Sequence, residues 1–479
     1  MLTSYRPFVG LVCVLALLAR TSNASEEPNP KPDPPEIESF EVSPMAEPVP
    51  AFKYRLYPLS SLRKPGNAAP IYLRFAHERS GETRKELFNG VDKFMIGPID
   101  SLDKAAARAF INRWGYNLRQ IDHAAHKTTC DWNYTVEEEM EHVYEMLLPD
   151  AQEMRQQHKL ICVQARVQMA EGKNEEALRS LETAFSMSSQ LGEGPFLING
   201  LIGIATAMKT ADQVIDFIQR PGAPNLYWAL TTLPTQLVPI RRGVDMEFAI
   251  GDLVCREFDQ LDQPAAPAEW QARLDRLTAR LNKLRNYIPK DEKIKSIVLD
   301  AKDPATVKLA RDYLTSRNRF TPAQLDAMTH PQMILWAVRD QYHEIRDMRF
   351  KVLMLPAWEA RRFVREISPK EEAKKPAELV TFAEILAPLL NRPAAAEPRL
   401  DRRIAALRLI EGLRLHAASH GGKLPASLDE VQEVTLPHDP ATGKAFDYKL
   451  EGANAVIESS GLGDTFQALK YTVKLRKSE

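Results

Sequence analysis

Cysteine is scarce in this chain, with 4 residues among 479. Three of them, Cys130, Cys162 and Cys255, lie beyond the N-terminal region, and so few cysteines exclude a fold that depends on many disulfides. In an oxidising compartment, these three would allow one disulfide and leave one thiol over. Buried free thiols are the simpler interpretation, which we prefer.

The chain also lacks a large net charge: 63 basic and 64 acidic residues leave a formal net charge of −1. Such a chain has no broad basic field for a phosphate backbone, so we expect no nucleic-acid partner. The sequence contains no Gly-x-Ser-x-Gly elbow, phosphate-binding loop, dinucleotide fingerprint or Cys-x-x-Cys-His haem site. It therefore indicates no cofactor and favours a non-enzyme, although catalytic groups can assemble from distant residues.

Long apolar runs are absent except at the N-terminus. Residues 7–19, PFVGLVCVLALLA, follow the positive Arg6 and precede Ser22 and Ala24, which fit the small-residue positions of a cleavage site. A membrane span needs about 20 apolar residues, so this shorter run predicts a signal peptide over residues 1–24. The alternative is an uncleaved anchor. Cleavage after Ala24 would leave a mature chain without a stable membrane span, in the periplasm or secreted.

Proline dominates the segment that follows the predicted cleavage site. Residues 25–50 contain eight prolines and many carboxylates. Proline removes backbone donors and favours extended chain, so this composition predicts a disordered tether. The tether would hold the folded part of the protein away from the signal-peptide end.

Residues 51–390 have the sequence pattern of packed helices: apolar residues recur at helical spacing, and Pro and Gly mark the turns between these segments. One pair of helices is expected to meet at a turn on Gly172. Small and apolar residues recur on the face that would close this pair: Ala165, Ala177, Leu181 and Ala184. The pair resembles one tetratricopeptide unit of about 34 residues, with departures at Asn174 and Ser189. We therefore expect a mainly α fold, a helical-hairpin, repeat-like array.

The helical pattern ends at NRPAAAEPR, and this stretch predicts a linker over residues 391–400. Residues 401–479 are expected to form a small α+β C-terminal domain. Its helix would stop at a Gly-Gly pair, and a short second helix would follow. Two alternating stretches, DPATGKAFDYKLEGANAVIES and ALKYTVKLRK, are typical of antiparallel strands.

The C-terminal stretch resembles the globular part of type II secretion pseudopilins, in which a helix, two turns and a small antiparallel sheet follow one another. The turn residues carry the resemblance: Gly422, Leu424, Pro425, Asp439, Pro440, Gly443, Lys444 and Phe446. Pseudopilins begin with a prepilin leader and a polymerising apolar helix. Here the pseudopilin-like domain would follow a helical region and a conventional signal, so the resemblance implies its fold and not filament assembly.

A second resemblance covers most of the mature chain. It rests on CDWN at residues 130–133, on QRPGAPNLYWALTTLP at residues 219–234, and on the C-terminal stretch at residues 404–452. These segments resemble a family of large secreted proteins from planctomycete bacteria with no assigned activity. The resemblance implies export and supplies no reaction.

Two groups of histidines are candidates for a metal site. His416 and His420 have the i, i+4 spacing that can place two imidazoles on one ion, and His438 could complete the site if its loop folds back. The alternative is that His416 packs beside the core and His420 lies near the carbonyls that end a helix. His123, His126 and Cys130 form a second candidate group, unless they mark only a helix end.

These observations predict an exported, non-enzymatic binding or scaffold protein of the cell envelope. Stacked helices offer an extended surface for a protein or peptide partner. Two alternatives remain open. One is a metal-assisted hydrolase that uses a histidine cluster, and the other is an accessory component of a secretion or envelope machine.

Overall fold

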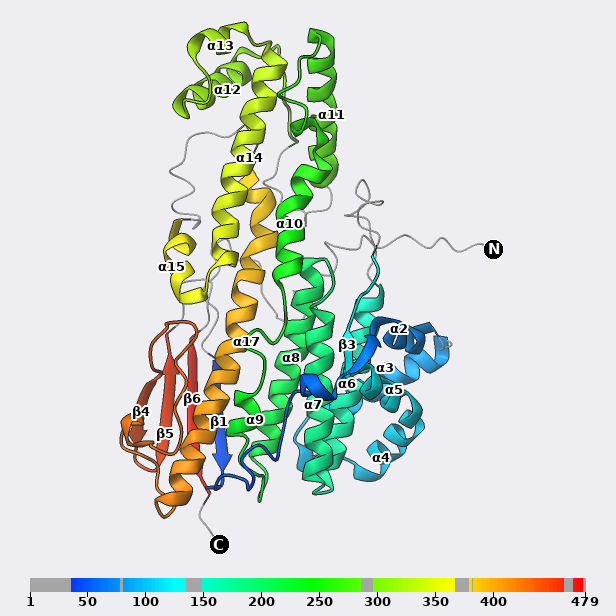
Figure 1. Ribbon diagram of the computed structural model, residues 1–479, viewed down its shortest axis with the longest axis vertical. Helices are drawn as coiled ribbons and strands as arrows, with labels where there is room; N and C mark the ends of the chain where they lie inside the picture. The colour runs from blue at the N-terminus through cyan, green and yellow to red at the C-terminus, as the bar shows by residue number, and fades with distance from the viewer. Residues whose placement is uncertain are drawn as a thin grey trace.

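The computed structural model describes residues 36–77, 81–134, 149–285, 296–366, 379–380, 382–460 and 468–476. It confirms the predicted fold class, because most of the described chain is helical and a small mixed sheet lies near the C-terminus. Figure 1 shows an elongated body with the sheet at one end of the long axis and helices α11 to α13 at the other.

The N-terminal helices pack against one long helix, α6. They are α2 (Ala69–His77), α3 (Gly81–Met95), α4 (Lys104–Arg113) and α5 (Gly115–Ala125), and α6 spans Pro149–Ala170. Two short parallel strands, β2 (Lys64–Asn67) and β3 (Lys127–Thr129), connect this layer to the segment before it. The shared core contains aromatic and aliphatic side chains, among them Tyr72, Val91, Trp114 and Ile121.

The predicted hairpin is formed by α6 and α7 (Asn174–Leu191). Gly172 makes the turn with a φ of 72°, a left-handed conformation that glycine adopts without strain. Helix α8 (Leu197–Ile218) then packs against both members of the hairpin. A Cβ on Gly203 would lie 2.7 Å from the Ser188 carbonyl, so this glycine permits the close approach of α7 and α8.

The chain then builds a second helical lobe. The short helix α9 (Tyr227–Thr231) still packs against the first core, and the lobe itself consists of α10 (Arg241–Val254), the 3-10 turn η4 (Arg256–Phe258), α11 (Pro267–Arg285), α12 (Pro304–Ser316), α13 (Pro322–Ala327), α14 (His330–Met354) and α15 (Ala357–Glu366). Helix α14 ends before Pro356, where Leu355 is extended because a residue that precedes proline avoids the helical conformation. Helix lengths from 6 to 25 residues in this lobe show no fixed repeat.

The predicted linker at residues 391–400 is wrong, because helix α17 (Phe382–Ser419) runs through it without a break. Proline usually ends a helix, and Pro393 and Pro398 suggested a linker on that ground. The alanines at 394–396 favour helix, and the C-terminal half of α17 buries an apolar face that includes Leu400 and Leu407. Tertiary packing therefore outweighs the cost of the prolines.

The predicted tether is also wrong in its second half. Residues Glu36–Val42 form strand β1, which pairs in parallel with β6 (Leu469–Leu475). Strands β5 (Asn454–Ser459) and β4 (Asp447–Glu451) complete the sheet in the order β1-β6-β5-β4. Phe40 and Val42 are buried. Apolar and polar residues alternate here as in a strand, and the surrounding prolines obscured this signal. Residues 25–35 and the predicted signal peptide at residues 1–24 lie outside the described residues.

Three clusters of buried side chains run along the molecule. The first joins the sheet, α17, α8 and α9, the second lies under the N-terminal helices, and the third lies between η4, α11, α12 and α14. No helix in the described ranges has both the length and the apolar character that a bilayer crossing requires.

Candidate functional site

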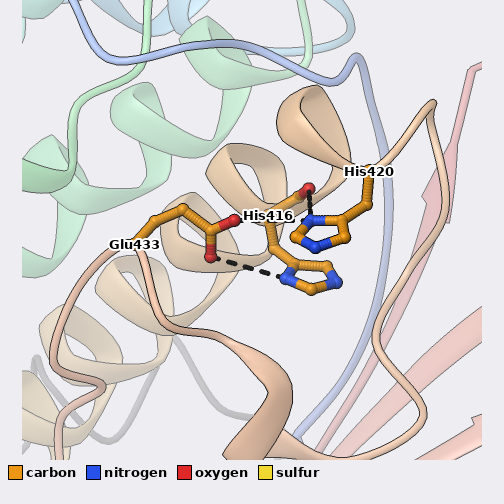
Figure 2. Close-up of side chains that lie close together, drawn as sticks. All are labelled: His416, His420 and Glu433. Atoms are coloured by element: carbon orange, nitrogen blue, oxygen red, sulfur yellow. Dashed lines mark hydrogen bonds and ion pairs between the residues drawn. The ribbon is translucent and has the colours of Figure 1, made fainter.

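The C-terminal end of α17 brings two of the predicted histidines together with a carboxylate. His416 lies in the last turn of α17 and His420 directly follows its last residue, and Glu433 approaches them from the segment that follows the 3-10 turn η5 (Leu428–Glu430). Ligand atoms of these three side chains all lie within 4.8 Å of one another. Figure 2 shows the two imidazole rings stacked, with the carboxylate beside them.

The backbone explains why these side chains meet. Gly421 and Gly422 have φ of 61° and 76°, and the Gly422 N–H donates to the Ala417 carbonyl at 2.8 Å. This left-handed turn ends the helix and sends the chain back along it. Val431 and Val434 are then buried in the core and fix the position of Glu433 between them. The Gly-Gly stop predicted from the sequence is confirmed as the end of α17.

The two imidazole rings differ in their surroundings. The His416 side chain is 5% exposed and that of His420 is 53% exposed. Their ring centroids are 3.9 Å apart at an interplanar angle of 13°. Each Nδ1 lies 3.4 Å from a different oxygen of Glu433, and Ser419 Oγ donates a hydrogen bond to the same carboxylate.

The Glu433 carboxyl group is held in its charged form. Burial alone would raise its pKa, but the hydrogen bond from Ser419 and the nearby His416 outweigh that effect, so the pKa lies below its ordinary value of 4.5. The site therefore presents one carboxylate beside two imidazole rings. Such a group can share protons internally or hold a cation.

The third predicted ligand, His438, does not join the site. His438 is exposed, and the group formed by the described residues contains Glu433 in its place. Its neighbour Asp439 is buried in a turn, where it accepts hydrogen bonds from the Ala441 backbone and from Ser459 Oγ at 2.7 Å. The loop does not fold back because Asp439 fastens it to the sheet.

The second predicted group, His123, His126 and Cys130, is not assembled either. Helix α5 ends at Ala125, and strand β3 follows, so Cys130 is not on the same helical face as the histidines. His123 is exposed, whereas Cys130 is buried with its backbone N–H donating to Glu193. The alternative interpretation, a helix end that leads to a packed cysteine, describes this segment.

The three cysteines in the described ranges, Cys130, Cys162 and Cys255, are buried free thiols, which confirms the preferred interpretation. Burial raises the pKa of both Cys162 and Cys255 to about 12, and it raises that of Cys130 well above its ordinary value. A thiol must ionise to act as a nucleophile, so none of these three is suited to catalysis at neutral pH. His158 lies 3.8 Å from Cys162, but burial lowers its pKa to about 3 and leaves it neutral.

Comparison with known proteins adds no functional assignment: no family model, curated protein or solved structure matches the chain. The site described above is therefore interpreted from its own geometry.

Proposed function

We propose that the protein is an exported, non-enzymatic binding or scaffold protein of the cell envelope. Its partner surface would be the strap, which we define as residues 43–63. This segment follows β1 and crosses α9 and α7 before β2 begins (Figure 1). The partner would be a protein or peptide with apolar side chains.

The supporting observation is the concentration of exposed apolar side chains on the strap. Val49 is 92% exposed, Phe52 52%, Leu59 40% and Leu62 65%. They make up four of the eleven large hydrophobic side chains exposed within the described ranges. Apolar side chains that gather on one surface segment are typical of interaction sites, whereas scattered ones are ordinary.

Side-chain and backbone contacts hold the strap in place. Trp228 Nε1 donates to Glu47 Oε2 at 2.8 Å, and the Tyr57 hydroxyl donates to Ser189 Oγ at 3.0 Å. The rings of Phe52 and Trp228 lie 5.4 Å apart. A preordered surface loses less conformational entropy on binding than a free segment, which favours a docking role.

A buried ion pair fastens the start of the strap to α17. Arg414 and Glu411 are both fully buried and lie 2.7 Å apart. The Arg414 side chain also donates to the Ser43 carbonyl at 2.9 Å, and the Met45 N–H donates to the Arg414 carbonyl at 3.1 Å. These contacts compensate the buried positive charge of Arg414, which would destabilise the fold if it had no partner. The strap and α17 therefore stabilise each other.

The charge of the strap suggests the character of its partner. The strap contains Lys53, Arg55 and Arg63 but only one acidic residue, Glu47, and of the three basic side chains Lys53 already pairs with Glu175 at 3.1 Å. A partner segment that combines apolar and acidic side chains would complement this surface.

Site-directed cross-linking tests the proposal. A photoreactive residue in place of exposed Phe52 should capture a discrete envelope protein in living cells. Val49→Asp or Leu62→Asp should weaken capture by more than about tenfold, because a charge would enter the apolar contact. Ile96→Asp is the matched control, since Ile96 is 77% exposed but lies outside the strap.

Two outcomes would count against the proposal. Capture that is unchanged in Val49→Asp and Leu62→Asp would remove the strap as the docking surface. Cross-links that join only copies of this chain would assign the strap to self-assembly.

A further inference from the structure

One nitrogen of the candidate site is buried and makes no hydrogen bond. The His416 side chain is 5% exposed, and its Nδ1 has no hydrogen bond in the described structure. The nearest carboxylate oxygen, on Glu433, is 3.4 Å away, longer than the roughly 2.8 Å of a charge-assisted hydrogen bond. An unsatisfied buried polar atom is costly, so a ligand at this nitrogen would stabilise the protein.

The second imidazole is oriented by the backbone. His420 Nδ1 lies 2.9 Å from the His416 carbonyl oxygen. A carbonyl oxygen only accepts hydrogen bonds, so Nδ1 donates, and Nε2 is the ring nitrogen left for a ligand. Imidazoles that bind metals are commonly held in this way by a carbonyl on the other ring nitrogen. Because His420 is 53% exposed, an ion can reach this ring from solvent.

The spacing of the donor atoms is close to that of a coordination site. A tetrahedral zinc ion with bonds of 2.0–2.1 Å separates its ligand atoms by about 3.4 Å. The three side chains already place ligand atoms within 4.8 Å of one another. Side-chain rotations that move these atoms by roughly 1–2 Å, with some tilting of the stacked rings, would complete the geometry.

We propose that His416, His420 and Glu433 bind one zinc-class transition-metal ion. Two imidazole nitrogens with one carboxylate oxygen suit such ions, whereas calcium and magnesium prefer sites built from oxygen alone. Three protein ligands leave a fourth position for water. The ion would connect the loop that carries Glu433 to the end of α17 and would coordinate the buried His416 nitrogen that makes no hydrogen bond.

The test measures zinc binding to the mature, tag-free chain by competition with a chromophoric chelator. We expect one Zn²⁺ per chain. His420→Ala and Glu433→Gln should each weaken binding by more than about tenfold, because each removes a direct ligand. His438→Ala is the matched control and should bind like the wild type. His416 is buried, so its replacement would also disturb packing, and the two more accessible ligands are the better variants.

A second readout separates a metal site from a purely internal hydrogen-bond network. Zinc should raise the Tm of the wild type and of His438→Ala but not that of His420→Ala. Binding should weaken as the pH falls, because protons compete with zinc for the ligand atoms. The proposal is overturned if the wild type binds no stoichiometric zinc below about 10 µM, or if His438→Ala loses as much affinity as His420→Ala.

Discussion

The acidic side chain of Asp401 shows what burial does to a single residue. Asp401 follows Glu397 by one turn on α17. Burial, with a smaller contribution from the negative charge of Glu397, raises the pKa of Asp401 from 3.8 to about 7. The folded protein therefore keeps a proton that the unfolded chain releases at lower pH.

This shift predicts a loss of stability as the pH rises from about 4 to about 7, because over that range the unfolded chain ionises freely and the half-buried carboxyl of the folded protein resists ionisation. Asp401→Asn should remove the penalty and stabilise the protein at pH 8 by roughly 2 kcal/mol, after allowance for solvent screening. The advantage should vanish near pH 4. Thermal unfolding across this pH range checks the prediction, with the exposed Asp262→Asn as control. Equal Tm gains at pH 4 and pH 8 would contradict it.

Single residues also show how far the candidate site could be predicted. The i, i+4 spacing of His416 and His420 placed both on one face of a helix, and the structure brings them together. Glu433 could not be chosen from the sequence, because its position depends on where Val431 and Val434 enter the core. Many carboxylates in the chain have the same local sequence character, and only tertiary packing distinguishes this one.

Strand β1 is the element whose structure differs most from what its sequence predicted. Its sequence alternates, but the surrounding prolines indicated a tether, and no local pattern reveals a parallel partner more than 400 residues away. Arg403 on α17 contacts Glu36 and Glu38 of β1 and Asp212 of α8. The position of β1 is thus determined by a long-range ion-pair network and by the uncovered edge of β6.

The two faces of β1 should respond differently to truncation. Phe40 is 1% exposed and packs at 5.0 Å against the Tyr471 ring, whereas Ile37 on the same strand is 68% exposed. Phe40→Ala should cost about 3–5 kcal/mol of unfolding free energy, as large-to-small core changes do. Ile37→Ala should change it by less than about 0.5 kcal/mol. Denaturant unfolding measures both, and equal small effects would show that β1 contributes little to the sheet.

At the scale of the whole molecule, the three cores are not equally connected. The first two share helices, since Phe185 and Met187 of α7 belong to different clusters, as do Leu197 and Ile198 of α8. The third cluster draws mainly on η4, α11, α12 and α14 at the far end of the long axis (Figure 1). Composition and periodicity predicted a helical body, but they could not predict this division, which depends on the packing of helices distant in sequence.

This arrangement predicts that the third core unfolds separately from the other two, since regions with few shared contacts open independently. Leu274→Ala, in the third cluster, removes a fully buried side chain, and Leu181→Ala does the same in the first. Each should cost about 2–5 kcal/mol locally. Calorimetry should show two transitions, with Leu274→Ala lowering only one and Leu181→Ala only the other. A single transition lowered equally by both variants would instead show that the long helices α14 and α17 couple all three cores into one cooperative unit.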